Sequence, residues 1–372
     1  MTQPSAIVHA RGTAMLRSAL GPAIAAWLDD ANVSEIMLNA DGRLWVDHLD
    51  SGIADTAERL SPLQAERIIR LVAHHVGAEV HRDAPRVSAE LPEGGERFEG
   101  LLPPVVAEPV FSIRRPASLP LALADYVAAG TMTATAAAYL AQAVQTRANI
   151  LVAGGTSTGK TTLTNALLGV ASGGSDRIVL IEDTRELRCD AANVVALRTA
   201  PGVTMTDLVR SSLRLRPDRI PIGEVRGPEA LDLLKAWGTG HPGGIGTIHA
   251  GTATAALHRL EQLILEAIAH VPRPLIAETI DVIAVLTGRG PERRLSELIR
   301  VEGLEPDGTY RLLPIHLATG AASLPVCRNF SVPASSRPQF SPRRRPGREA
   351  PACPGRRRSS RSSTQCRDPS PR

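Results

Sequence analysis

In two stretches near the start of the chain, apolar residues recur at the spacing of an amphipathic α-helix. Residues 13–30 predict a short amphipathic helix, and residues 61–76 predict a second one. Ser61 suits the N-cap of the second helix and Pro62 suits its first turn. The apolar positions predicted to form one face of this helix are Leu63, Ile68, Leu71, Val72 and Val76.

Strand patterns surround these helices. Residues 35–47 (EIMLNADGRLWVD) predict two strands joined at Asp41-Gly42, a pair typical of hairpin turns. Residues 86–115 alternate as further strands and end in FSIRRP. These elements together predict an α+β N-terminal domain over residues 1–115.

Later in the chain, short apolar runs alternate with helical stretches. Helices are expected over 133–145 and 163–170, and buried strands over 149–153 and 177–181. Apolar strands that alternate with helices favour a parallel sheet covered on both faces. The sequence therefore predicts an α/β domain.

The α/β domain is expected to span residues 132–316. A linker with two prolines and one glycine is expected over 116–131. Residues 317–372 are rich in Arg, Pro and Ser and lack apolar periodicity, which predicts a disordered tail. A frameshifted reading frame would give the same abrupt change of composition, so both origins of the tail stay open.

Net charge and cysteine content also differ between the tail and the rest of the chain. The chain has 42 Lys and Arg against 38 Asp and Glu, a net charge of +4, but residues 328–372 alone carry +10. The remaining chain is therefore mildly acidic, and a hint of nucleic-acid or membrane binding applies only to the tail. Cys189 is the one cysteine before the tail and there is no CxxC pair, so the sequence supports neither a zinc site nor a disulfide framework.

No stretch approaches the roughly 18 apolar residues of a membrane span, and no signal-peptide pattern begins the chain. A cytoplasmic protein is expected, with peripheral membrane contact through partners.

The most specific motif is GGTSTGKT at residues 154–161, which follows a predicted strand and precedes a predicted helix. Glycines let the loop curl so that backbone N–H groups form a nest for phosphates. Lys160 is expected to reach the β- and γ-phosphates, and Thr161 to offer a hydroxyl to Mg²⁺. The sequence thus predicts ATP and Mg²⁺ as ligands. The expected nucleotide-binding residues are Gly154, Gly155, Thr156, Ser157, Thr158, Gly159, Lys160, Thr161 and Thr162.

Acidic residues stand at two other predicted strand ends. Glu182 follows a buried strand in IEDTRE, and Glu224 follows IPIG. In open α/β sheets this edge binds ligands, and a phosphate site needs carboxylates for magnesium and for the attacking water. Glu224 is expected to act on magnesium through water or to polarise the nucleophile, with Glu182 as the other candidate base. Alternatively, either acid caps a helix or pairs with Arg185 or Arg226.

Two histidines lie in TGHPGGIGTIHAG. Their spacing and the intervening glycines do not fit a zinc pair on one helix. We expect a loop followed by a strand, with His249 near the γ-phosphate as a sensor. For His241, a loop histidine bonded to backbone is an equal alternative.

Three arginines of the N-terminal part are candidates for phosphate contact: Arg97, Arg114 and Arg115. Arginine suits bidentate contact with phosphate, and an arginine supplied from outside the phosphate loop accelerates phosphoryl transfer. Solvated arginines paired with acids are the alternative.

The order of these motifs resembles the type II/IV secretion ATPases, with GGTSTGKT, IEDTREL, LRLRPDRIPIGEVRG and TGHPGGIGTIHAG in series. Among these ATPases, the similarity is greatest to TrbB-like conjugal transfer ATPases, in the segments RPDR, GEVRGPEALDLLKAW and TGHPGG. The resemblance covers residues 13–316, and the tail matches nothing in the family.

The resemblance implies a RecA-like P-loop NTPase domain with a smaller α+β N-terminal domain. It further implies a hexameric ring that holds nucleotide between the two domains and powers a type IV secretion channel at the inner membrane. By motif position, Glu182 is the Asp-box acid, Glu224 the Walker B acid, with Thr161 at the metal, and His249 the His-box residue. Arg97 and Arg114 or Arg115 correspond to arginines that close on nucleotide.

One departure from the family pattern is Pro221, which stands inside the predicted Walker B strand, where proline removes a ladder donor.

Two rival functions stay open. One is a pilus extension or retraction ATPase, although the tetracysteine zinc spacing of many such proteins is absent. The other is nucleic-acid binding through the basic tail, which lacks aromatic stacking platforms apart from Phe330 and Phe340.

Overall fold

The computed structural model describes residues 3–92, 94–116, 121–200 and 202–315. The predicted tail at 317–372 lies outside these residues, as does part of the predicted linker at 116–131. The boundaries predicted for the domains therefore stay predictions. Within the described part of the chain, no helix has both the length and the apolar character that crossing a bilayer requires.

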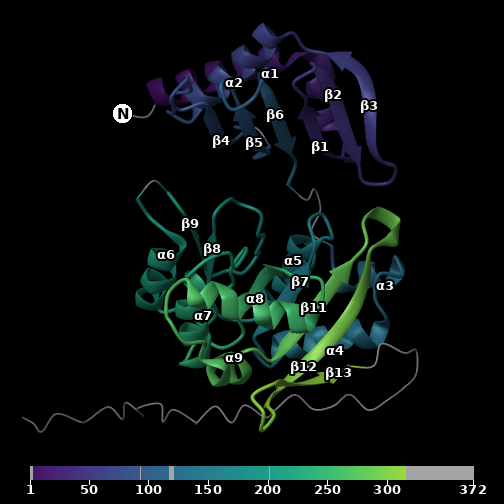
Figure 1. Ribbon diagram of the computed structural model, residues 1–372, viewed down its shortest axis with the longest axis vertical. Coiled ribbons are helices and arrows are strands. Elements are labelled where there is room, and N and C mark those ends of the chain that lie inside the picture. Colours follow the sequence, from purple (N-terminus) through teal and green to yellow (C-terminus); the bar gives the residue numbers. More distant parts are fainter. Residues whose placement is uncertain (1–2, 93, 117–120, 201, 316–372) are drawn as a thin grey trace, which may run out of the picture. The chain divides into compact units, whose positions relative to one another are not determined.

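The N-terminal part of the described chain is built on an antiparallel sheet, ordered β3-β2-β1-β6-β5-β4, with two long helices on one of its faces (Figure 1). Its elements run α1 (Gln3–Asp29), β1 (Val33–Leu38), β2 (Arg43–His48), β3 (Gly52–Arg59), α2 (Pro62–His75), β4 (Arg86–Glu90), β5 (Arg97–Leu101) and β6 (Val110–Arg114). The predicted α+β mixture is confirmed.

The hairpin between β1 and β2 turns where the sequence predicts. Gly42 has φ 79°, a conformation that glycine adopts without strain, and its N–H donates to the Asn39 carbonyl at 2.9 Å. The first helix differs from the prediction, because it begins at Gln3 and breaks at Gly21, where φ is 79° before Pro22.

The buried face of α2 is partly different from the predicted one. Ser61 caps the helix as expected, through a capping box with Gln64. Leu63 and Val76, however, are 77% and 43% exposed. The residues that pack against the sheet are Ala65, Ile68, Ile69, Val72 and Ala73. Leu63 lies on the side of α2 turned away from these residues, and Val76 is the C-cap residue, just past the last turn of the helix.

The C-terminal part of the described chain combines sheet and helices in an α/β arrangement. Its elements are α3 (Leu123–Ala128), α4 (Ala134–Gln145), β7 (Ile150–Gly154), α5 (Lys160–Ala171), β8 (Ile178–Glu182), β9 (Val194–Arg198), α6 (Met205–Ser212), η1 (Leu213–Leu215), α7 (Glu229–Gly238), β10 (Ile245–His249), α8 (Ala253–Leu265), α9 (Arg273–Thr279), β11 (Val282–Thr287), η2 (Gly290–Glu292), β12 (Arg294–Leu304) and β13 (Tyr310–Pro314). The helix α3 forms within the segment predicted as linker.

Strand β7 lies between β10 and β11 and runs parallel to both. Ile150 and Val152 point into a core shared with α3, α4 and α5, whereas Leu151 and Ala153 point into a core shared with α6, α7, α8 and α9. Helices thus cover both faces of the sheet (Figure 1), and this arrangement explains the continuous apolar run in β7.

The segment predicted as the Walker B strand joins β8 to β10 without forming a regular strand. Ile222 bridges Ile181 on one side and Gly246 on the other. The carbonyl of Pro221 accepts a hydrogen bond from Ile181 N at 3.0 Å. Proline has no N–H to return, so the ladder is interrupted at this residue while the neighbouring bridges keep the segment in the sheet.

We predict that Ile68→Ala lowers the free energy of unfolding by about 2–5 kcal/mol, because it empties a fully buried site on α2. Leu63→Ala, on the same helix, should change it by no more than about 0.5 kcal/mol. Urea unfolding followed by circular dichroism measures both. Equal losses in the two variants would contradict the observed orientation of α2.

Candidate functional site

The glycine loop leaves the sheet at Gly154, where side chains have no room. A Cβ on Gly154 would lie 2.5 Å from Thr158 Oγ1 and 2.7 Å from the Leu286 carbonyl oxygen. Gly159 has φ 91°, and a Cβ there would lie 2.9 Å from Arg293 Nε. Both positions therefore need glycine, one because of close packing and the other also because of its left-handed backbone.

The loop delivers Lys160 to the first turn of α5. Its Nζ donates to the carbonyls of Gly154 and Gly155 at 3.1 and 2.9 Å. Burial lowers the pKa of Lys160 from its ordinary value, and the charge of Glu224 opposes that shift. Gly159 caps α5, and among the described residues no side chain caps this helix end. Free backbone N–H groups and a lysine at a helix N-terminus fit phosphate groups.

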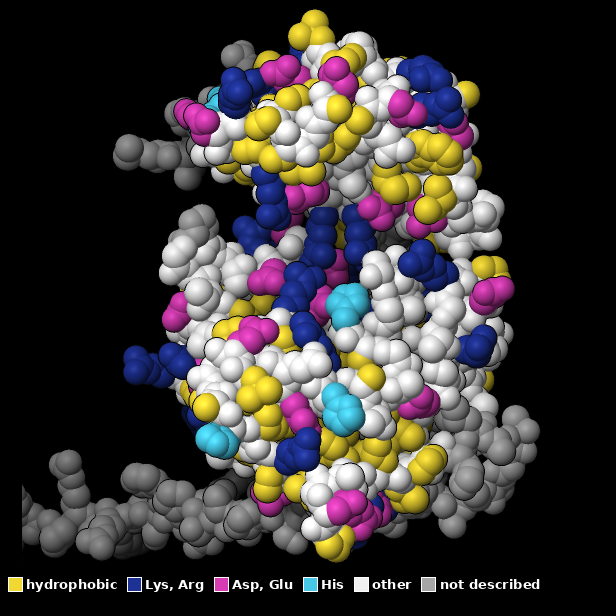
Figure 2. Space-filling model, in the orientation of Figure 1, with side chains coloured by type: hydrophobic (Ala, Val, Ile, Leu, Met, Phe, Trp, Pro, Cys, Tyr) yellow, Lys and Arg dark blue, Asp and Glu magenta, His cyan; other side chains and the backbone are white. Residues whose placement is uncertain are grey.

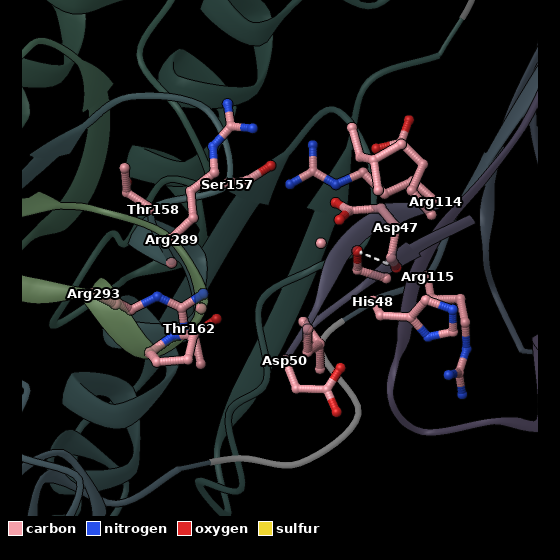
Figure 3. Close-up of a pocket in the computed structure, with 18 of the residues that line it drawn as sticks. Asp47, His48, Asp50, Arg114, Arg115, Ser157, Thr158, Thr162, Arg289 and Arg293 are labelled. Carbon is pink, nitrogen blue, oxygen red and sulfur yellow. Dashed lines mark hydrogen bonds between the residues drawn. The ribbon is translucent and has the colours of Figure 1, made fainter. Parts of the chain in front are cut away.

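Loop residues Ser157 to Thr162 line a cavity of about 730 Å³. Figure 3 shows Ser157, Thr158 and Thr162 on one side of this cavity and Asp47 and Arg114 on another. Charged and histidine side chains among its lining residues are Glu35, Asp47, His48, Asp50, Arg114, Arg115, Lys160, Glu186, Arg289, Glu292 and Arg293. Basic and acidic side chains also gather around a hollow in the face seen in Figure 2. The cavity is of the size that holds a small-molecule ligand.

His249 connects the phosphate loop with the acid of the Walker B segment. Parallel pairing sets His249 opposite Gly154, at the ends of β10 and β7. Its Nδ1 lies 3.4 Å from Lys160 Nζ, and its Nε2 lies 2.8 Å from Glu224 Oε1. Burial lowers the pKa of His249 from its ordinary value. The predicted loop and strand in this segment are confirmed.

Glu224 is held by two basic neighbours, His249 and Arg226. Its Oε2 accepts a hydrogen bond from Arg226 Nη2 at 2.5 Å. Its Oε1 is buried, and no described group donates a well-directed hydrogen bond to that oxygen. This oxygen contacts His249 Nε2 without a well-directed hydrogen bond and lies near the charge of Lys160, so it keeps the capacity to accept a hydrogen bond from a water molecule or a reacting group.

Glu182, the other predicted acid, is turned toward the protein interior. Its Oε1 accepts hydrogen bonds from the backbone N–H groups of Glu186 at 2.9 Å and Leu187 at 2.7 Å. The residue is 3% exposed, and this burial raises the pKa of its carboxyl group. Glu182, Glu224 and His249 are all absent from the residues that line the cavity, so the bonding of each acid distinguishes their roles. Glu182 therefore shapes the loop after β8, which carries Glu186 to the cavity.

Glu186 was not among the predicted residues, although it belongs to the same IEDTRE motif. Its Oε2 accepts a hydrogen bond from Thr161 Oγ1 at 3.0 Å, and its Oε1 pairs with Arg97 Nη1 at 3.0 Å. The signal in the sequence was a third acid one turn after a strand end. Which of these acids faces the cavity depends on the path of the loop.

The predicted arginines have different surroundings. Arg97 and Arg114 are directly opposite on β5 and β6, an arrangement of like charges that destabilises a sheet unless anions lie nearby. Arg97 has Glu186 as its partner, whereas Arg114 lines the cavity. Arg115 also lines the cavity, but its guanidinium donates to the backbone carbonyls of Asp30 and Val33.

Two further cavity arginines, Arg289 and Arg293, come from the turn between β11 and β12 (Figure 3). The sequence segment GRGPERR gave no motif to mark them. The Nδ1–H of His241 donates a hydrogen bond to the Pro217 carbonyl at 2.8 Å, which matches the alternative of a loop histidine bonded to backbone.

The described residues contain no cluster of three or more His, Cys, Asp or Glu that would hold a metal ion by themselves. Thr161, the predicted magnesium ligand, donates to Glu186, while the predicted partner Glu224 lies against His249. A hydroxyl with a carboxylate behind it suits Mg²⁺, which keeps several waters and takes few protein ligands when phosphates supply the rest.

Gly154→Ala should lower the free energy of unfolding by about 1–3 kcal/mol, since the new methyl group would overlap Thr158 and a backbone carbonyl. Gly155→Ala is the matched control, because a Cβ there meets only Thr158 Cγ2, at 3.7 Å. Urea titration compares the two variants. A destabilisation in Gly155→Ala as large as in Gly154→Ala would contradict the packing described for the loop.

Comparison with known proteins now adds relatives. The sequence is 50% identical over 306 residues to the probable conjugal transfer protein TrbB of Sinorhizobium fredii, covering 82% of this chain and 94% of that protein. It is 34% identical to the type IV secretion system protein PtlH of Bordetella pertussis, covering 75% and 93% of the two chains.

Solved structures support the fold. The crystal structure of the pilus retraction motor PilT with bound ADP matches with a TM-score of 0.54 at 22% identity, covering 79% of this chain and 83% of that one. The Legionella pneumophila ATPase DotB matches with a TM-score of 0.50 at 18% identity, covering 77% of each chain. The predicted RecA-like ATPase fold is confirmed by these likenesses.

The family description that matches residues 67–289 is "Type II/IV secretion system protein". This range includes the phosphate loop, the two acidic segments and His249. Because this range matches the family and the chain is 50% identical to a relative over 306 residues, 94% of that relative, this chain belongs to the type II/IV secretion system protein family.

Proposed function

We propose that this chain is an ATPase that energises a type IV secretion system of the conjugal transfer kind. The observation that carries the proposal is the meeting of Lys160, His249 and Glu224 at the end of β7, beside an uncapped helix N-terminus. The identity to a probable conjugal transfer protein supports the type of system.

In the proposed reaction, the backbone of the glycine loop and Lys160 bind the phosphates of ATP. Mg²⁺, when bound, neutralises charge that develops on the phosphates. Thr161 is the side chain that would hold it, with Glu186 orienting the hydroxyl. Arg114 would add a positive charge from the N-terminal sheet.

Glu224 is the proposed group that orients the attacking water. Its side chain is mostly buried and has an oxygen without a well-directed donor, so it can accept a proton or a hydrogen bond. Glu182 instead uses one oxygen for two backbone N–H groups of the loop after β8. We therefore assign Glu182 to loop structure, and Glu224 to the reaction. His249 would transmit the state of the phosphate to Glu224.

The homohexameric ring, the channel components at the inner membrane and the cytoplasmic placement are also proposals, which rest on the family. The rival function in pilus retraction has only the PilT likeness, which at 22% identity concerns the fold alone. The nucleic-acid alternative rests on residues outside the described part of the chain.

Lys160→Ala should reduce ATP turnover by at least about 100-fold, because the variant loses the positive charge at the phosphates. Phosphate release measures the rate, and circular dichroism confirms that the variant is folded. Normal turnover in the folded variant would overturn the assignment of the phosphate site. The proposed ring has its own test, the mass of the wild-type chain in solution with ATP and Mg²⁺. A monomeric mass would count against assembly into a hexamer.

Glu224→Gln should retain nucleotide but slow hydrolysis by about 10²–10⁴-fold, the usual range for loss of a general base. Glu182→Gln is the matched control: an amide oxygen can still accept both backbone hydrogen bonds, so turnover should stay within about tenfold of wild type. Single-turnover hydrolysis with a fluorescent nucleotide-binding assay separates the steps. The reverse ranking of the two variants would move the base role to Glu182.

A further inference from the structure

One row of charged residues crosses four strands of the N-terminal sheet. Glu35 on β1 is opposite Arg114 on β6, Arg114 is opposite Arg97 on β5, and Arg97 is opposite Glu90 on β4. Residues in register across a sheet share a face. We call Glu35, Arg114, Arg97 and Glu90 the charged row.

The charged row lies on the face opposite α1 and α2. The adjacent row, one residue along each strand, contains Ile36, Ile113 and Phe98, which are 0 to 2% exposed and pack in the core with the helices. Because neighbouring residues of a strand point to opposite faces, the charged row points away from this core. Its side chains must find partners elsewhere.

Two members of the charged row hold the loop that follows β8. The Glu90 carboxylate accepts a hydrogen bond from Arg198 Nη1 at 2.6 Å and one from the backbone N–H of Arg185 at 3.2 Å. Arg97 pairs with the Glu186 carboxylate at 3.0 Å. Glu90 thus meets Arg198 at the end of β9, and Arg97 meets Glu186 in the loop after β8, so the contact is complementary in charge.

The same loop is held from inside by Glu182, through the N–H groups of Glu186 and Leu187. The backbone N–H groups of three successive residues are therefore bound by two glutamates, Glu90 from the N-terminal sheet and Glu182 from β8. Glu186, in the middle of this run, accepts the hydrogen bond of the Thr161 hydroxyl. The position of Glu186 depends on both anchors.

We propose that Glu90 is a positioning residue for the nucleotide site, acting through the loop 183–187. By holding Arg185 and Arg198 it keeps the Glu186 carboxylate on Thr161 and Arg97, so that contact between the N-terminal sheet and this loop is coupled to hydrolysis. The catalytic part of this inference rests on the proposed ATPase function. The structural part, that Glu90 orders the loop, does not.

The energetic basis is the partial burial of these groups. Side chains of Glu90, Glu186 and Arg97 are 22, 20 and 28% exposed, so water screens their interactions less than at an open surface. Removal of Glu90 would leave Arg198 and the Arg185 N–H without their acceptor. A small displacement of a positioned group costs as much as about 100-fold in rate.

The test uses Glu90→Ala in the full-length chain, with Glu99→Ala as the matched control. Glu99 lies on β5 two residues from Arg97, on the same face, but pairs with Arg86 and bonds to Ser88 within the sheet. The first measurement is hydrogen–deuterium exchange of the peptide covering 183–187 without nucleotide. We expect exchange at least about tenfold faster in Glu90→Ala, and unchanged in Glu99→Ala, as the loop opens locally.

The second measurement is ATP turnover. Glu90→Ala should lower kcat about 10- to 100-fold with KM changed less than about twofold, because the loop is mispositioned while the phosphate loop is intact. Arg198→Gln should lower kcat as well, Arg198→Lys should largely restore it, and Glu90→Ala with Arg198→Gln should be no worse than Glu90→Ala alone.

The outcomes separate the two proposals. Unchanged exchange in folded Glu90→Ala overturns the positioning role, whatever the turnover. If exchange is faster in Glu90→Ala but the wild-type chain shows no ATP turnover, the proposed function is overturned and the structural part of the inference stands. Equal losses in Glu90→Ala and Glu99→Ala would show a general effect on the sheet and would also overturn the inference.

Discussion

The register of β7 between its two neighbours fixes the geometry on which the site depends. Parallel pairing sets His249 of β10 and Leu286 of β11 both opposite Gly154. The Leu286 carbonyl then closes the space that a side chain at Gly154 would need. A one-residue shift of β10 against β7 would turn His249 to the other face of the sheet, and the same shift of β11 would take the Leu286 carbonyl away from Gly154. The apolar residues of β7, packed on both sides, oppose such a shift.

Polar groups that would otherwise be costly to bury complete the site. Glu182 is nearly inaccessible to water, yet its carboxylate meets two backbone N–H groups that lack other partners in the turn. The two hydrogen bonds compensate for the burial of the carboxylate and fix the path of the loop that carries Glu186. The neighbouring acid, Glu224, remains incompletely bonded and faces Lys160 and His249. Environment thus separates the roles of two glutamates that stand at similar strand ends.

Pro221 illustrates how a local defect is tolerated beside the site. It interrupts the hydrogen-bond ladder in the segment before Glu224, but its carbonyl still accepts from Ile181. Gly223 N donates to the Ile181 carbonyl and Ile222 bridges both neighbouring strands, so Glu224 is held at the sheet edge. The sequence identified the missing donor correctly. It did not show that flanking bridges compensate for that donor.

The sequence by itself determined the parts whose physics is local. Glycine loops, strand-to-helix transitions and the order of motifs depend on backbone freedom and on short-range periodicity, so the phosphate loop, the α/β pattern and the family were predictable. The tertiary structure decided the rest. Leu63 is exposed because the side of α2 that faces the sheet is the one that carries Ile68, Ile69 and Val72. The roles of Glu182 and Glu186 separate because of the path of one loop. Contacts such as Glu90 with Arg198 join residues 108 positions apart, and no short-range pattern records which distant charges will meet.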